Sequence, residues 1–144
     1  MDVRRAVIAD IPRLVDLAQA EHGRSRFSGE PFDRERTALS FDQAIGGLAT
    51  AVFVSDTTGG FIVGLVQPHL FNRRLTVYEL AWYAEDGSGL QLLRALVRWA
   101  WSMKAVDVIV SNYAGIVEPD RFNRAMRRFG FDPLGTSFAL HLEK

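Results

Sequence analysis

The segment 75–104 constrains the fold more than any other part of the chain, because a short glycine turn joins two different periodicities there. Residues 75–84 are rich in β-branched and aromatic side chains, which favours a strand. Residues 87–104 predict an amphipathic helix, whose apolar residues at helical spacing are Leu90, Leu93, Val97 and Ala100. Since the apolar run 106–111 follows as another strand, the segment predicts a parallel β-helix-β crossover in an α/β fold.

Alternation along residues 75–84 predicts which side chains share a face of the sheet. One face is expected to carry Val77, Glu79, Ala81 and Tyr83. The other is expected to carry Tyr78, Leu80 and Trp82. Glu79 therefore lies mid-strand among apolar residues, where loss of hydration raises the pKa of a carboxyl group.

The remaining elements follow from caps, turns and periodicity. Residues 3–7 predict a strand, and Asp10 is expected to cap a helix with an apolar face of Ile11, Leu14, Val15 and Ala18. Asp33 is expected to cap a second helix with a face of Ala38, Phe41, Ile45 and Leu48. Strands 51–55 and 61–66 flank a hairpin turn, DTTGG. A helix over 120–129 and a strand over 138–142 complete the chain.

This order predicts one domain over residues 1–144. Its fold class is α/β, with a mixed, mostly antiparallel central sheet and helices on both faces. The 17 basic and 17 acidic residues balance, and the chain shows no basic stripe, so nucleic-acid binding is not expected.

Composition excludes further classes of function. The chain has no cysteine, which excludes disulfides, thiolate metal sites and a cysteine nucleophile. Its three histidines lie far apart and show no metal-ligand spacing, so no metal is expected. The sequence shows neither a signal-peptide pattern nor about 20 consecutive apolar residues. We therefore expect a cytoplasmic protein that does not act at a membrane.

The turn Gly87-Ser88-Gly89 stands where the predicted helix begins. The first N–H groups of a helix have no partner within it, and together with the helix dipole they attract a phosphate or a pyrophosphate. The alternative is an ordinary strand-to-helix turn that contains two glycines and binds nothing. The patterns of a P-loop and of a dinucleotide-binding G-x-G-x-x-G turn are both absent.

The segment as a whole resembles the acyl-coenzyme A motif of the GNAT N-acetyltransferases. The resemblance rests on residues 79–84, Gly87-Ser88-Gly89-Leu90 and residues 92–96. It extends to the opening Arg5-Ala6 and Asp10-Ile11, to Asn112 after the next strand, and to 128–131 (RFGF). Nearly the whole chain fits the order of the family's motifs.

The resemblance implies a ligand and a set of site residues. Acetyl-CoA would be the co-substrate, and an amine would attack its thioester directly. The backbone of Ala81, Trp82 and Tyr83 would pair with the pantetheine arm. The amides of Gly87, Ser88, Gly89 and Leu90 would hold the pyrophosphate, and Asn112 would contact the coenzyme.

Glu79 is the candidate base that takes the proton of the amine, since it occupies the place of a catalytic glutamate in some members of the family. Two alternatives stay open: a glutamate on a solvated strand face, and one paired with an arginine. Tyr113 is the candidate acid for the leaving thiolate, against the alternative that this aromatic ring fills the core.

The chain departs from the family pattern at two places. Ala84, Glu85 and Asp86 stand where an Arg or Gln is usual, and carboxylates near a pyrophosphate repel it. Met126 stands where many members place a catalytic tyrosine. We therefore expect weak coenzyme binding. The arginine-rich run 121–128 is interpreted as a solvated helix face or, alternatively, as a contact to the coenzyme's phosphates.

The expected function is acetyl transfer from acetyl-CoA to a primary amine of a small molecule or peptide. One alternative is a GNAT-fold coenzyme-binding or regulatory module without catalysis, and another is an interaction domain that binds no coenzyme. Trp99 and Trp101 on the motif helix indicate core packing or a subunit contact, so a homodimer remains among the expectations.

Overall fold

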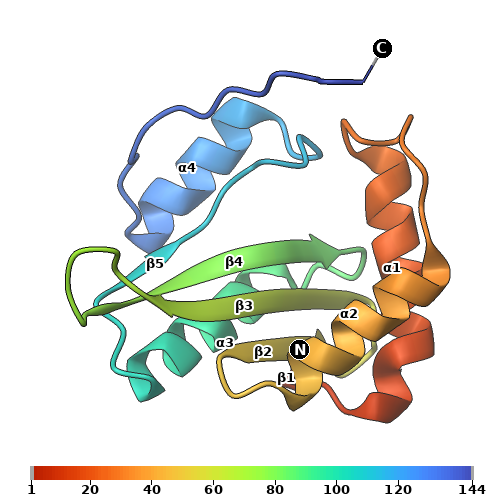
Figure 1. The fold of residues 1–144 in the computed structure, drawn as a ribbon, viewed down its shortest axis with the longest axis horizontal. Helices are drawn as coiled ribbons and strands as arrows, with labels where there is room; N and C mark the ends of the chain where they lie inside the picture. Colours follow the sequence, from red (N-terminus) through yellow and green to blue (C-terminus); the bar gives the residue numbers. More distant parts are fainter. Residues whose placement is uncertain (1, 144) are drawn as a thin grey trace.

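The computed structural model describes residues 2–143, and its elements follow the predicted order as far as residue 129 (Figure 1). The strands are β1 (Val3–Arg5), β2 (Thr50–Ser55), β3 (Gly60–Pro68), β4 (Leu75–Ala84) and β5 (Asp107–Ile109). The helices are α1 (Ile11–Arg24), α2 (Arg34–Gly46), α3 (Gly89–Ser102) and α4 (Pro119–Phe129), with a short 3₁₀ turn, Ile8–Asp10, before α1.

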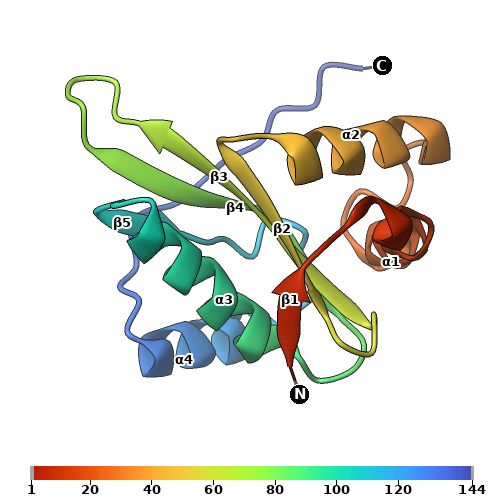
Figure 2. The same ribbon diagram turned by 90° about the horizontal axis from the view of Figure 1, so that it is seen from below.

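The sheet confirms the predicted fold class. Its five strands lie in the order β1-β2-β3-β4-β5, and each neighbouring pair is antiparallel except β4 and β5, which are parallel. Helix α3 makes the connection between these two parallel strands. Figure 2 shows α1 and α2 on one face of the sheet, and α3 and α4 on the other. No helix in the described part of the chain is long and apolar enough to cross a membrane.

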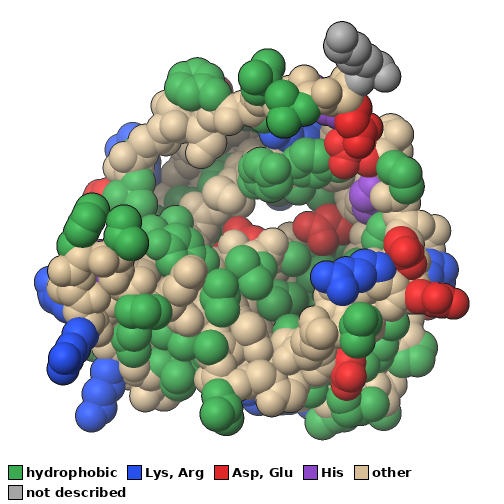
Figure 3. Space-filling model, in the orientation of Figure 1, with side chains coloured by type: hydrophobic (Ala, Val, Ile, Leu, Met, Phe, Trp, Pro, Cys, Tyr) green, Lys and Arg blue, Asp and Glu red, His purple; other side chains and the backbone are tan. Residues whose placement is uncertain are grey.

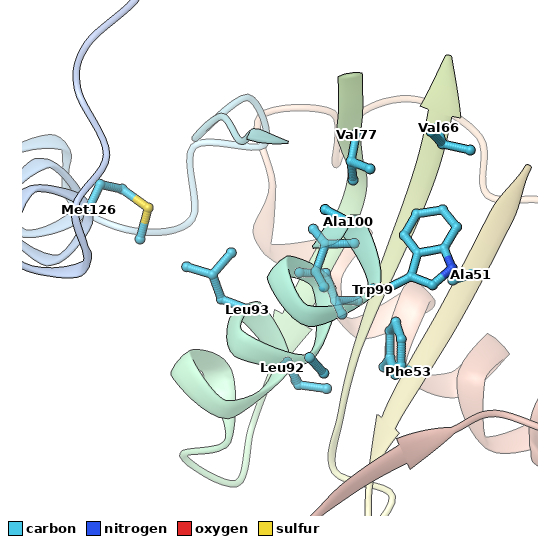
Figure 4. Close-up of a cluster of buried hydrophobic side chains, with 12 residues drawn as sticks. Ala51, Phe53, Val66, Val77, Leu92, Leu93, Trp99, Ala100 and Met126 are labelled. Carbon is cyan, nitrogen blue, oxygen red and sulfur yellow. The ribbon is translucent and has the colours of Figure 1, made fainter. Parts of the chain in front are cut away.

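The two faces of the sheet bury two separate hydrophobic clusters. Trp99, Leu92 and Leu93 of α3 pack against Phe53 and Val77 of the sheet (Figure 4). On the other face, α1 and α2 pack against the opposite side chains of β2 and β3, which are Val52, Val54, Phe61 and Val63. Because β2 and β3 are covered on both faces, their sequences read as continuous apolar runs. Burying each large side chain contributes about 1.5–3 kcal/mol.

The prediction of which side chains of β4 share a face is wrong, because the strand contains a bulge. Gly64 pairs with Glu79 and Val63 pairs with Ala81, so Leu80 has no partner on β3. The extra residue reverses the alternation beyond it. Val77 accordingly packs on the α3 side together with Trp82, whereas Ala81 and Tyr83 pack on the α1 side.

Three helix details also differ from the predictions. Asp10 does not cap α1 with its side chain; its carboxylate accepts the N–H of Val7 and pairs with Arg4. Leu48 lies beyond α2 and is 96% exposed. The predicted apolar face of α3 is shifted, because Leu90 is 43% exposed. The buried residues of the helix are Leu92, Leu93, Ala95, Leu96, Trp99 and Ala100.

The predicted strand over 3–7 is shorter in the structure, Val3–Arg5, and two others differ more strongly. The strand expected over 106–111 is limited to Asp107–Ile109, because β5 pairs with only three residues of β4. The strand predicted over 138–142 is wrong: residues 131–143, all of them described, form neither helix nor strand. Phe138, Leu140 and Leu142 alternate as in a strand but are exposed, so this segment buries no apolar face.

Candidate active site

The separation of β4 from β5 creates a large cavity. Within residues 2–143, β5 pairs only with Thr76–Tyr78, while β3 stays paired with β4 as far as Ala84. Residues 79–84 therefore present an edge without a neighbouring strand to a cavity of about 1040 Å³. Its other walls come from the end of α1, the start of α3, the segment 111–118 and α4. Figure 3 shows this hollow, with acidic side chains in it.

Glu79 projects from the bulge of β4 into this cavity, as a base would have to do. Its Oε1 accepts the N–H of Ser111 at 3.3 Å, which connects the two strands where they separate. Burial raises the pKa of Glu79 to about 7, although the bond from Ser111 opposes the shift. The predicted rise of this pKa is confirmed. Glu79 is partly buried, and among the described residues it forms no ion pair with an arginine.

Glu21, from the last turns of α1, is a second carboxylate in the same cavity and was not predicted. Burial and the repulsion of Glu79 raise the pKa of Glu21 to about 7, and a hydrogen bond from the backbone of Trp82 partly offsets this rise. Both pKa values lie close to neutral pH, which suits a site where an amine must lose a proton. No group of three or more potential metal ligands was found in the described part of the chain.

The glycine turn lies at the opposite end of the cavity. Gly87 has a φ of +80°, a conformation that favours glycine, and Gly87, Gly89 and Leu90 all line the cavity. Ser88 differs from the prediction for it. Its side chain is fully buried, and its N–H donates to Asp86 Oδ1 at 3.0 Å. The Ser88 amide is therefore already used, which leaves three of the four predicted residues facing the cavity.

Asp86 points away from the cavity and into the β2–β3 hairpin. Its Oδ2 accepts the hydroxyls of Ser55 at 2.6 Å and Thr57 at 2.5 Å. Burial would raise the pKa of Asp86, but the bonds from Ser55, Ser88 and Thr57 outweigh it and hold the pKa well below the usual range. A Cβ on Gly59 would lie 2.8 Å from Asp86 Oδ2, so this glycine allows the close approach. The expected repulsion of a pyrophosphate by Asp86 is thereby reduced.

The three strand residues predicted to contact the pantetheine arm all line the cavity. Trp82 donates its Nε1–H to the carbonyl oxygen of Gly89 at 3.1 Å and so fixes the turn against the strand. The hydroxyl of Tyr83 accepts a hydrogen bond from Arg24 at 3.2 Å, which connects the strand to the end of α1. Ala81 packs in the cluster beneath α1.

Asn112 and Tyr113 stand in the loop after β5 and also line the cavity. The Asn112 amide donates to Val117 O at 2.7 Å, so its nitrogen shapes the loop. The Tyr113 ring packs on Phe27 with centroids 5.0 Å apart, and the Arg26 guanidinium lies 4.9 Å from the tyrosine centroid. Since Tyr113 is 59% exposed, the alternative that its ring fills the core is wrong. Its hydroxyl remains a candidate acid.

Met126 lies across the cavity on α4, and it is buried against the α3 cluster (Figure 4). Its thioether has no proton to donate to a leaving thiolate. A methionine at this position therefore offers no acid, as the sequence predicted.

Comparison with solved structures shows the same fold in acetyltransferases. The chain superimposes on a crystal structure described as a probable acetyltransferase with a TM-score of 0.78 and 14% identity, covering 100% of this chain and 99% of the other. It matches a Trypanosoma brucei acetyltransferase with a TM-score of 0.72 and 14% identity, covering 98% and 99%. A transcriptional regulator from Bacillus halodurans matches with a TM-score of 0.75 and 15% identity, covering 98% and 99%.

No protein-family model and no curated protein sequence matches the chain. The structural matches share little sequence with it, so they establish the fold and leave the chemistry to be argued from the site. At the level of the fold, the resemblance to GNAT acetyltransferases is confirmed.

Proposed function

We propose that this protein transfers an acetyl group from acetyl-CoA to a primary amine of a small molecule or peptide. The observation that carries the proposal is the position of Glu79. A partly buried carboxyl group, whose pKa desolvation raises to about 7, stands where β4 and β5 separate, in a cavity that also reaches the glycine turn. The cavity thus joins a proton acceptor to exposed helix N–H groups that suit a diphosphate.

The cavity offers a group suited to each part of the coenzyme. The unpaired edge of Ala81–Tyr83 offers backbone groups to the amides of a pantetheine arm, as a neighbouring strand would. Gly87, Gly89 and Leu90 stand at the far end for the diphosphate. This arrangement directs the thioester toward Glu79 and leaves the wall formed by Phe27, Tyr113 and Glu21 for the acceptor.

The chemical step needs no protein nucleophile. The amine nitrogen attacks the thioester carbonyl, a C–N bond forms and the C–S bond breaks. Glu79 accepts the proton that the nitrogen loses, and the thiolate leaves with its electron pair and takes up a proton. We assign this second proton to the Tyr113 hydroxyl. Tyr113 is the tyrosine nearest in sequence to Met126, and it lines the same cavity. Positioning and one general base are sufficient for such a reaction.

Calorimetric titration with acetyl-CoA at low salt, followed by an acetylation assay on a panel of amines, tests the proposal. Release of the coenzyme thiol can be followed without background, because the protein has no cysteine. Glu79→Gln should lower turnover about a hundredfold or more while leaving acetyl-CoA affinity nearly unchanged. Glu35→Gln, an exposed carboxyl group on α2, serves as the matched control with unchanged turnover.

Each contrary result identifies a different error. Wild-type turnover by Glu79→Gln removes Glu79 from the mechanism. Coenzyme binding without transfer to any amine supports a binding or regulatory module, which the buried Met126 would explain. Absence of coenzyme binding overturns the proposal altogether.

A further inference from the structure

Helix α4 carries an excess of positive charge that the proposed reaction has not used. Its arginines, all exposed, are Arg121, Arg124, Arg127 and Arg128. Only Arg121 lines the large cavity, and it does so together with Gly87, Gly89 and Leu90. The other three arginines do not line the cavity, so they provide matched controls on the same helix.

Contacts through Trp82 hold the first turn of α4 close to the glycine turn. The ring of Phe122, the residue after Arg121, packs on Trp82 with centroids 6.3 Å apart. Trp82 in turn donates its Nε1–H to Gly89 O at 3.1 Å. Figure 2 shows α4 beside α3 on the same face of the sheet. Phe122 and Trp82 thus connect the start of α4 to the start of α3, and they place Arg121 near the residues where the diphosphate is proposed to bind.

The charges around Arg121 leave its guanidinium free to bind an anion. Glu118 also lines the cavity, but both its oxygens accept backbone N–H groups, those of Asp120 and Arg121, each at 3.0 Å. Arg24, the other arginine in the cavity wall, donates to the Tyr83 hydroxyl at the α1 end. Among the described residues, the Arg121 guanidinium has neither a hydrogen bond nor an ion pair.

We infer that Arg121 binds a phosphate of the coenzyme's diphosphate and supplies the positive charge that the short turn Ala84-Glu85-Asp86 lacks. This inference rests on the proposed function. A guanidinium offers two parallel N–H donors to a phosphate, which gives a stronger and more specific contact than a neutral amide. Arg121 therefore favours thioesters that carry the nucleotide end over thioesters that end at the pantetheine.

The test compares acetyl-CoA with S-acetylpantetheine, which has the same thioester and arm but no diphosphate. Arg121→Gln should weaken acetyl-CoA binding by about tenfold to a hundredfold and reduce its salt dependence. The same variant should leave kcat/KM for S-acetylpantetheine unchanged. Arg121→Lys should retain part of the affinity, since a point charge remains without the fork of donors. Arg124→Gln should bind acetyl-CoA as the wild type does.

Three results would overturn the inference. In the first, Arg121→Gln binds acetyl-CoA as tightly as the wild type. In the second, Arg121→Gln weakens the use of both thioesters by the same factor. The substitution would then disturb binding of the pantetheine arm or the fold of the protein. In the third, Arg124→Gln loses as much acetyl-CoA affinity as Arg121→Gln. The overall positive charge of α4, and not a contact specific to Arg121, would then attract the coenzyme. If the wild type neither binds nor acetylates with either thioester, the proposed function fails together with the inference, whereas the three results above refute only the inference.

Discussion

At the scale of single residues, the carboxyl pair Glu21 and Glu79 makes folding depend on pH. The pKa of each is about 7 in the folded protein, above the ordinary value of 4.5 that applies in the unfolded chain. Between these two values the unfolded chain has released protons that the folded protein still binds, so stability falls as the pH rises. The contribution is fully present below the unfolded pKa and is lost as the pH approaches the folded value.

Glu79→Gln should therefore be more stable than the wild type at pH 8, by about 1–3 kcal/mol in the free energy of unfolding. A glutamine cannot ionise, and its amide oxygen can still accept the N–H of Ser111. The difference should shrink toward zero at pH 4, where both side chains are uncharged. Chemical denaturation at several pH values measures it, with Glu35→Gln as the control. Equal stability differences at pH 4 and pH 8 would show that Glu79 is not desolvated.

The sequence predicted the raised pKa of Glu79 because a carboxyl group within an apolar strand is a local signal. Glu21 was missed, although a signal for it exists. It continues the buried stripe of α1 after Leu14 and Leu17, at the spacing of one more helical turn. The direction of Asp86 could not be predicted, because its donors Ser55 and Thr57 lie about thirty residues away in the sequence and meet it only in the folded sheet.

At the scale of the elements, Gly64 lies beside the bulge and allows β3 to pack closely against α3. A Cβ on Gly64 would lie 2.4 Å from Leu96 Cδ1 and 3.2 Å from Trp99 Cζ3, and both of these side chains are buried. Gly64 is also the partner of Glu79 at the bulge. Local patterns predicted β4 with its observed bounds, Leu75–Ala84, but alternation alone could not predict the extra residue at Leu80.

Gly64→Ala should destabilise the protein by about 1–3 kcal/mol, because the added methyl group overfills a packed layer. Gly23→Ala is the matched control with the opposite sign. Gly23 lies within α1 and a Cβ there meets nothing within 4 Å, so alanine should stabilise the helix by about 0.5–1 kcal/mol. Thermal unfolding of both variants gives the comparison. A Gly64→Ala protein as stable as the wild type would mean that α3 can move away from the sheet.

At the scale of the whole molecule, two clusters on opposite faces of the sheet hold β1 to β4 with α1, α2 and α3. Helix α4 joins them through its apolar face, with Met126 in the α3 cluster. The segment after it adds Phe131, which packs on Phe129 with centroids 5.6 Å apart. Beyond that point the alternation of Phe138, Leu140 and Leu142 predicted a strand, yet a strand also needs a paired edge, which a local pattern does not provide.

Removal of residues 136–144 therefore tests whether the C-terminal segment contributes to the fold. In the structure Phe138, Leu140 and Leu142 are 93%, 84% and 85% exposed, so the truncated protein should unfold within about 2 °C of the full chain. Truncation after Gly130 also removes Phe131 and should lower Tm clearly. If the shorter truncation instead lowers Tm by about 5 °C or more, the segment pairs as a strand in solution. Size-exclusion chromatography with light scattering then decides the partner: a full-length dimer that becomes monomeric on truncation indicates pairing with a second copy, and an unchanged monomer indicates pairing within the chain.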